Sequence, residues 1–155
     1  MENTYFHQNR KRVHQAFFTE QFLIPLIDNT EPIIIKEDKG IMIISFWATW
    51  CKPCIQELDY LNDFYDELNG EKEVTVYAIS IDDARSVKRV LPFVNGKNWE
   101  FEILLDKNSD LKRKMNVLNV PHTFIIDKNR KIVYQHTSYI PGDEEEYWKI
   151  IESLN

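Results

Sequence analysis

Hydrophobic residues follow two kinds of pattern along the chain. Residues 41–46 and 74–81 are mostly β-branched or apolar, which is typical of short strands buried on both faces of a sheet. Between these runs, apolar residues recur every three or four positions over residues 52–68, and this spacing predicts an amphipathic helix. A strand, a helix and a second strand in this order predict two parallel strands joined by a crossover helix.

The remaining sequence continues the alternation of strands and helices. We expect further helices at residues 83–94, 111–118 and 144–154, and further strands at residues 33–35, 100–105, 123–126 and 131–134. Polar turns before residue 41 and before residue 131 predict two hairpins. The sequence therefore predicts an α/β fold with a central mixed β-sheet and helices on both faces.

The first 31 residues follow a weaker pattern. Residues 4–23 are rich in polar side chains, with a few apolar residues at loosely helical spacing, so we expect a weakly helical N-terminal segment, residues 1–31, before a domain at residues 32–155. A cleavable signal peptide needs an apolar run of about 7–15 residues, and the run from Phe22 to Ile27 is short and contains Pro25. Either the protein is cytoplasmic or a signal has already been removed.

Composition and charge argue against several classes of protein. A chain of 155 residues with 43% hydrophobic and 28% charged residues has the balance of one globular domain. The net charge of −6 argues against a nucleic-acid partner, because nucleic-acid-binding proteins are usually basic. No apolar run approaches the roughly 20 residues that a membrane-spanning helix needs. We expect a monomer that binds no nucleic acid.

Cysteine usage points to redox chemistry. The chain has two cysteines, Cys51 and Cys54, in the sequence WCKPC. A disulfide between them would close a very small loop and would therefore stabilise the fold little. A structural zinc ion usually needs four ligands, and the four histidines are too scattered to complete such a site. We expect no metal, and the alternative to redox chemistry is a pair of inert, buried cysteines.

The position of the cysteines favours a reactive dithiol. Cys51 follows a predicted buried strand and begins the predicted helix, where unpaired N–H groups and the helix dipole favour a thiolate. Lys52 adds a positive charge, and Pro53 fits the first turn because its missing N–H is not needed there. Cys54 lies one turn further along the same face. It can therefore attack a mixed disulfide formed at Cys51 and release the reduced substrate.

Two stretches of the sequence resemble a known family. The sequence FWATWCKPC at residues 46–54, followed by Glu57, resembles the active-site stretch of the thioredoxin superfamily, and more narrowly that of the TlpA/ResA-like thiol-disulfide oxidoreductases. The sequence VPHTFIIDK at residues 120–128 is similar to the family's loop that carries a cis-proline facing the cysteines. Over residues 32–154 the resemblance implies a thioredoxin-like fold and a dithiol–disulfide oxidoreductase that needs no bound cofactor.

The resemblance also implies partners and a compartment. Proteins of this family mostly reduce protein disulfides in an oxidising compartment, and a membrane thiol carrier or a thioredoxin reductase-type donor supplies their electrons. We therefore expect protein disulfide substrates and a periplasmic or extracytoplasmic location, with or without a membrane anchor. A cytoplasmic location is the alternative, because no signal peptide is visible in the sequence.

Further site residues follow from the resemblance. Glu57 stands where the family has a carboxylate that serves the second cysteine, and its spacing from Cys54 places it on the same helix face; the alternative is a solvated helix residue. Ser45 stands where minimal thioredoxins have a buried proton-shuttling aspartate. His122 replaces a threonine of the family's loop and either tunes the charge of the site or lies exposed. The residues expected to bind substrate are Trp50, Lys52, Pro53, Val120 and Pro121, the last in a cis peptide bond.

Other functions of this fold remain as alternatives. Peroxiredoxins need Thr or Ser three residues before the reactive cysteine, and Ala48 stands there. Copper-delivery relatives use C-x-x-x-C with a distant histidine, whereas this chain has C-x-x-C. A thioredoxin-fold binding or metal-delivery module, in which the cysteine pair does not turn over, is the remaining alternative.

Overall fold

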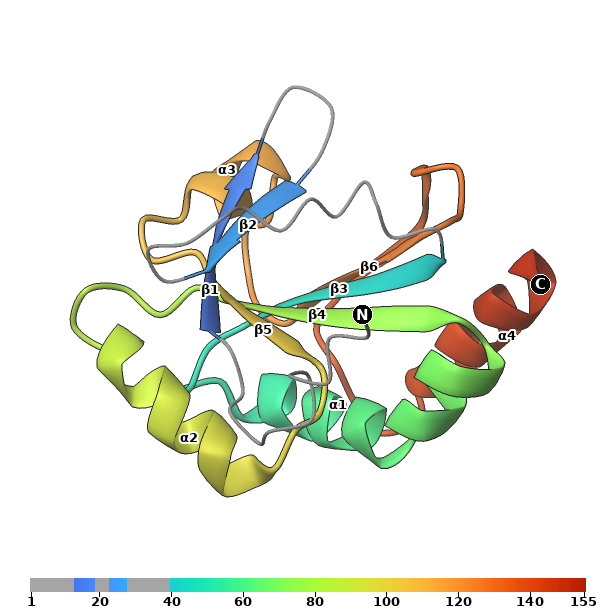
Figure 1. The fold of residues 1–155 in the computed structure, drawn as a ribbon, viewed down its shortest axis with the longest axis horizontal. Coiled ribbons are helices and arrows are strands. Elements are labelled where there is room, and N and C mark those ends of the chain that lie inside the picture. Colours follow the sequence, from blue (N-terminus) through green and yellow to red (C-terminus); the bar gives the residue numbers. More distant parts are fainter. Residues whose placement is uncertain (1–12, 19–22, 28–39) are drawn as a thin grey trace, which may run out of the picture.

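A seven-stranded mixed β-sheet forms the centre of the structure, a computed structural model that describes residues 13–18, 23–27 and 40–155 (Figure 1). The strands lie in the order β2-β1-β5-β4-β3-β6-β7. Their bounds are β1 Val13–Phe18, β2 Leu23–Ile27, β3 Ile41–Trp47, β4 Val74–Ser80, β5 Glu102–Leu105, β6 His122–Ile126 and β7 Ile132–Thr137.

Strand β3, which leads to the cysteines, lies in the interior of the sheet between β4 and β6. It pairs in parallel with β4 and antiparallel with β6, and all seven of its residues are buried. Its side chains alternate between two hydrophobic clusters, so Ile43 packs on one face of the sheet and Ile44 on the other. The prediction of a central strand buried from both sides is confirmed.

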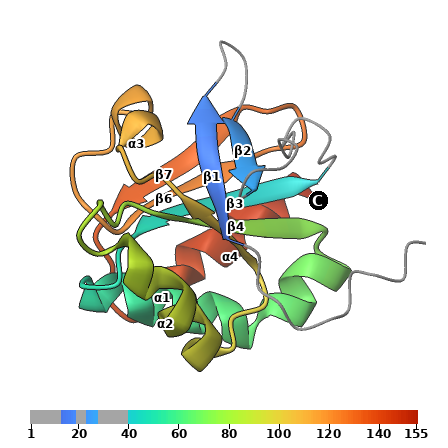
Figure 2. The ribbon, with the colours of Figure 1, turned by 60° about the vertical axis from the view of Figure 1, so that its left-hand side comes forward.

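Helices cover both faces of the sheet, as the sequence predicts (Figures 1 and 2). On one face lie α1 (Lys52–Asp63), α2 (Val90–Lys97) and α4 (Glu144–Leu154), and on the other lies the short helix α3 (Asp110–Lys114). The first three bury side chains such as Leu58, Val94 and Ile151 in one cluster, and α3 buries Leu111 in the other. Within the described ranges, no helix has the length and hydropathy needed to cross a bilayer.

The helix predicted over residues 4–23 is wrong in the part that the structure describes. Residues 13–18 form β1, which pairs antiparallel with β2 and in parallel with β5. A sheet edge offers unpaired N–H and C=O groups to a further strand, and this pairing outweighs a weak helical spacing. The domain boundary at residue 32 stays a prediction. The strand predicted at residues 33–35, with its hairpin, lies outside the described residues.

Helix ends also differ from the sequence-based expectations. The helix expected at residues 83–94 is a 3₁₀ turn at Val87–Arg89 followed by α2. Pro92 explains the later start, since proline is tolerated in the first turn of a helix but breaks its interior. The expected helix at residues 52–68 divides into α1 and a π-helical turn at Glu67–Glu71. The predicted hairpin of β6 and β7 and the terminal helix α4 are confirmed.

Candidate active site

The cysteine motif lies where β3 passes into α1. Cys51 caps the helix with an extended backbone, φ −102° and ψ 100°, and its Sγ accepts a hydrogen bond from the N–H of Cys54 at 3.4 Å. Pro53 lies in the first turn of α1, where an N–H would have no partner within the helix. The local sequence thus places both sulfur atoms at the N-terminal end of α1.

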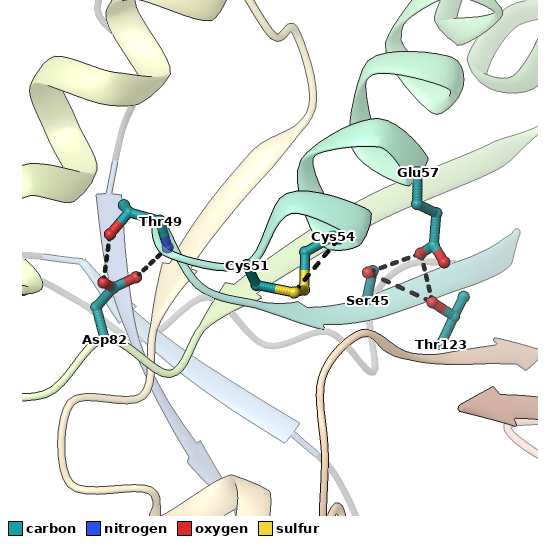
Figure 3. The surroundings of a disulfide bond; sticks show 7 residues. All are labelled: Ser45, Thr49, Cys51, Cys54, Glu57, Asp82 and Thr123. Carbon is teal, nitrogen blue, oxygen red and sulfur yellow. Dashed lines mark hydrogen bonds between the residues drawn. A yellow bond between two sulfur atoms is a disulfide. The ribbon is translucent and has the colours of Figure 1, made fainter. Parts of the chain in front are cut away.

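A disulfide bond joins Cys51 to Cys54 (Figure 3). Cys54 is wholly buried, and Cys51 is 6% exposed. The structure therefore shows the oxidised form of the dithiol that the sequence predicts, with the first cysteine nearer to solvent. No group of three or more potential metal ligands occurs in the part of the chain that the structure describes.

Glu57 lies one helical turn beyond Cys54 and is wholly buried. Its carboxylate accepts hydrogen bonds from three hydroxyl groups: Ser45 Oγ at 2.9 Å and Thr123 Oγ1, both to Oε1, and Tyr147 OH at 3.1 Å to Oε2. Burial raises the pKa of Glu57 above its usual value of 4.5, although these hydrogen bonds lower it. The alternative interpretation of Glu57 as a solvated helix residue is therefore wrong.

Three different elements supply the hydroxyl groups around Glu57. Ser45 belongs to β3, and Thr123 lies directly opposite it in β6. The Glu57 carboxylate of α1 therefore contacts the sheet at this cross-strand pair and accepts a hydrogen bond from each of the two residues (Figure 3). Tyr147 comes from α4. The sequence identified Ser45 only as a missing acid. The structure shows it as a hydrogen-bond donor to the acid that α1 supplies.

The proline loop lies at the same end of the sheet as the cysteines. Because β6 runs antiparallel to β3, with His122 opposite Phe46, the preceding residue Pro121 lies beside the end of β3 from which the cysteine loop continues. The Val120–Pro121 peptide bond is cis, and the carbonyl of Pro121 accepts a hydrogen bond from Ser138 N–H at 2.9 Å.

The other residues expected at the substrate surface differ in exposure. Trp50 is 63% exposed, Lys52 is exposed, Pro53 and Val120 are partly buried, and Pro121 is buried. Exposed and half-buried residues beside a disulfide can contact a docked protein. The arrangement therefore provides a place for a substrate chain, and its use stays a prediction.

His122 is not an exposed loop residue. It is 7% exposed, its ring stacks on Phe124 with centroids 4.6 Å apart, and its Nε2 lies 3.0 Å from Oε1 of Gln135. The side chain thus lies against Phe124 of its own strand β6 and Gln135 of β7. The suggestion that it tunes the charge of the site stays untested.

Sequence reasoning missed Asp82, which lies two residues beyond β4. Its carboxylate is wholly buried and accepts hydrogen bonds from the backbone N–H and the hydroxyl of Thr49 and from the hydroxyl of Ser80. Thr49 lies in the loop that leads to Cys51 (Figure 3). A usable signal existed, because polar residues just after a buried parallel strand lie at the edge where sites form in open α/β sheets.

Comparison with known proteins agrees with this geometry. Residues 20–135 match the AhpC/TSA family. A thiol-disulfide oxidoreductase ResA from Bacillus thuringiensis subsp. konkukian is 33% identical over 156 residues, which covers 90% of this chain and 86% of the relative. A solution structure of a thioredoxin-like protein from Porphyromonas gingivalis is 36% identical with a TM-score of 0.71, over 94% of this chain and 89% of that one.

A further structural match shows the fold alone. The crystal structure of StoA from Bacillus subtilis has a TM-score of 0.63 at 21% identity, over 86% of this chain and 96% of that one. Fold and site together define a thioredoxin-like thiol-disulfide oxidoreductase. The chain belongs to the AhpC/TSA family and, within it, to the ResA-type thiol-disulfide oxidoreductases.

Proposed function

We propose that the protein reduces or exchanges disulfides of other proteins, with Cys51 as the attacking thiol and Cys54 as the resolving thiol. The observation that carries this proposal is the Cys51–Cys54 disulfide at the start of α1 with a buried carboxylate, Glu57, one turn further along. A dithiol at this place has both a stabilised thiolate and a proton acceptor within the same helix.

The reaction begins with the reduced dithiol. The Cys51 thiolate attacks one sulfur of a substrate disulfide, a mixed disulfide forms, and the other substrate sulfur leaves as a thiolate. Glu57 then takes the proton of Cys54, and the resulting thiolate attacks Cys51 Sγ. The second substrate sulfur leaves, so that the substrate has gained two electrons and the enzyme holds the disulfide of the structure. The displaced thiolates take their protons from solvent or from Glu57.

The direction in which the pKa of Glu57 shifts favours this role. General acid–base catalysis is most efficient with a pKa near the operating pH, and burial moves the pKa of Glu57 upward from that of a free carboxyl. In the reverse direction, protonated Glu57 returns the proton to Cys54 as the disulfide opens. The same carboxyl can therefore serve reduction and oxidation.

Substrate binding would use the surface around the disulfide. Trp50 supplies an exposed apolar side chain directly before Cys51. Lys52 and Pro53 lie in the first turn of α1, and the Val120–Pro121 segment would offer its backbone to an extended substrate strand. Each of these residues belongs to the loop before α1, its first turn or the loop before β6, which meet at one end of the sheet.

The electron donor that we propose is a membrane thiol carrier or a thioredoxin reductase-type protein, and the location that we propose is periplasmic or extracytoplasmic, with or without a membrane anchor. The support for both is the similarity to proteins named thiol-disulfide oxidoreductase ResA. A midpoint potential would test the direction of the reaction. A reductant is expected at about −270 mV, whereas a strong oxidant lies at about −120 mV.

The function is tested by insulin reduction and by trapping of substrate. The reduced protein should accelerate insulin reduction by dithiothreitol. Cys54→Ser should accumulate mixed disulfides through Cys51, and Cys51→Ser should accumulate none. Equal trapping by both variants would remove the assignment of an attacking and a resolving thiol. A reduced wild-type protein without insulin activity would favour the binding or metal-delivery module instead.

A peroxidase is the other function that the AhpC/TSA match suggests. Ala48 stands three residues before Cys51, so the hydroxyl that peroxiredoxins need at this position is missing. We therefore expect no rapid consumption of hydrogen peroxide by the reduced protein. A peroxide-dependent oxidation of Cys51 that is faster than its reaction with protein disulfides would overturn the oxidoreductase proposal.

A further inference from the structure

Asp82 forms a buried anchor for the loop before the reactive cysteine. Its Oδ2 accepts hydrogen bonds from Thr49 N–H at 2.9 Å and from Ser80 Oγ at 2.7 Å, and its Oδ1 accepts one from Thr49 Oγ1 at 2.6 Å. The N–H of Asp82 in turn donates to Ser80 Oγ at 3.1 Å. The backbone N–H and the hydroxyl of Thr49 are thus both held by one carboxylate that lies 33 residues further along the chain.

The carboxylate is held by hydrogen bonds alone within the described part of the chain. Asp82 is 0% exposed, and in that part of the chain no ion pair includes it. A buried carboxylate is strongly unfavourable unless hydrogen bonds replace its lost hydration. The donors on Thr49 and Ser80 meet that need, and the same bonds tie the loop after β3 to the end of β4.

Two backbone hydrogen bonds complete the anchor. The carbonyl of Trp47 accepts from Ile81 N–H at 2.8 Å, and the carbonyl of Ala48 accepts from Cys51 N–H at 3.1 Å. The four-residue turn from Ala48 to Cys51 therefore follows a residue that is hydrogen-bonded to Ile81, just after β4. Asp82 holds the middle of the turn, and the bond from Cys51 N–H to the Ala48 carbonyl closes it. Trp50 is left exposed beside the cysteine.

We propose that Asp82 is a positioning residue that holds Cys51 in place for ring closure with Cys54. The proposal rests on the dithiol chemistry proposed above and deepens it. Holding two reacting groups in the right geometry raises their effective concentration. Asp82 acts through Thr49 on the conformation of the turn, and so favours the Cys51–Cys54 disulfide over the open dithiol.

The measurement is the thiol–disulfide equilibrium of the purified protein with glutathione. Asp82→Ala removes all acceptors for Thr49 and should lower the equilibrium constant for disulfide formation about tenfold, as expected when a positioned pair of groups is loosened. A tenfold change corresponds to a potential about 30 mV less negative. The free energy of unfolding of each variant is measured alongside, so that only folded protein is compared.

Asp82→Asn separates anchoring from charge. Its amide oxygen can accept from Thr49 N–H and its NH₂ can donate to Thr49 Oγ1, so the anchor remains while the negative charge is lost. We expect an equilibrium constant within roughly threefold of the wild type, which is under 1 kcal/mol. If Asp82→Asn and Asp82→Ala shift the equilibrium equally, the charge and not the anchor controls it, and the proposal is wrong.

Asp106→Asn is the matched control for a buried carboxylate. Asp106 is 2% exposed and accepts hydrogen bonds from the N–H groups of Leu111 and Lys112 at 3.1 and 2.8 Å, which lie at the start of α3. This change should reduce stability without moving the thiol–disulfide equilibrium. A shift as large as that of Asp82→Ala would mean that loss of any buried carboxylate produces the effect, and would overturn the proposal.

Thr49→Val keeps the test decisive if Asp82→Ala does not fold. Valine retains the shape and the backbone N–H but lacks the hydroxyl bonded to Asp82. It should shift the equilibrium in the same direction as Asp82→Ala and by less, and Thr49→Ser should restore it. No shift in folded Thr49→Val would refute the anchor. The assay needs no protein substrate, so a failure of insulin reduction would not be mistaken for a failure of this proposal.

Discussion

Replacing Glu57 by Gln tests whether the buried carboxyl moves a proton or only packs. Gln has nearly the same size and helix propensity. Its amide oxygen can accept from Ser45 and Thr123, and its NH₂ can donate to Tyr147, whose hydroxyl can also act as an acceptor. The hydrogen-bonded group should therefore remain, and the fold should survive the loss of the acid.

The kinetic effect should fall on the resolving step. General-base catalysis typically raises a reaction rate about a hundredfold or more. Water can replace part of this effect in a partly open site. We therefore expect the rate of attack by Cys54 to fall by roughly ten- to a hundredfold near pH 7. The deficit should shrink at high pH, where Cys54 ionises without help. Attack by Cys51 on a model disulfide should change little, because Glu57 serves the second cysteine.

Stability should change in a pH-dependent way. The folded pKa of Glu57 lies above its unfolded value of about 4.5, so between these two values the folded protein binds one proton more than the unfolded chain. The contribution of Glu57 is therefore fully favourable below pH 4.5 and is lost as pH rises to the folded pKa, with a slope of at most about 1.4 kcal/mol per pH unit. Glu57→Gln removes this slope, so the difference between the two proteins isolates it from other groups.

The assays are stopped-flow fluorescence for the resolving step and urea unfolding of the oxidised proteins between pH 4 and 9. Glu67→Gln is the matched control, because Glu67 is an exposed carboxylate in the π-helical turn that follows α1. An unchanged resolving rate, or a kinetic loss that persists at pH 10, would show that Glu57 does not handle the proton of Cys54. A pH-independent stability difference would show that its pKa is not raised.

Two further predictions concern the same site. Cys51 should react with iodoacetamide before Cys54, and the pKa of its thiol should lie below the free value of about 8.5, because Cys51 caps α1 and is the more exposed cysteine. Labelling of the reduced protein across pH checks this. Faster labelling of Cys54 would contradict it. Tyr147→Phe removes a donor to Glu57 and should raise the pKa of Glu57 further, so the pH profile of the resolving step should move upward. Tyr134→Phe, whose ring packs against Tyr147, is its control, and an equal shift in both variants would point to packing instead of the hydrogen bond.

The hydrophobic pattern predicts the elements whose own residues are apolar enough to require burial. Both β3 and β4 are buried along almost their whole length, and a dense apolar run has few other places in a folded domain. The terminal helix α4 has the predicted bounds, and its residues Tyr147 and Ile151, at helical spacing, are buried together. Local spacing and burial agree in these elements.

Elements that depend on distant partners could not be predicted in this way. Strand β1 forms because its backbone meets the free edge of β5, with His14 opposite Leu104. No property of residues 13–18 alone encodes that edge. The later start of α2 has a local cause, because Pro92 fits the first turn of a helix but not its interior. Apolar spacing over residues 83–94 alone predicts a helix that starts too early.

The site shows the same division between local and distant information. The cysteine pair was predicted because three residues of spacing place it on one turn. The surroundings of Glu57 could not be predicted in this way. Its hydrogen-bond donors Ser45, Thr123 and Tyr147 come from three elements that meet only in the folded chain. Spacing placed the carboxyl on the correct face, and only the fold shows that this face is sealed from solvent.

Ser45 and Glu57 form one arrangement, although the sequence presents them as two separate departures from minimal thioredoxin. An aspartate in place of Ser45 would put a second carboxylate beside Glu57, whose Oε1 lies 2.9 Å from Ser45 Oγ. Two buried carboxylates so close together cannot both ionise. A serine instead donates a hydrogen bond and leaves the acid to α1. Because α1 also carries Cys54 and begins directly after its cap Cys51, the resolving thiol and its proton acceptor lie on one rigid helix, which holds their geometry more tightly than a carboxyl on a separate strand would.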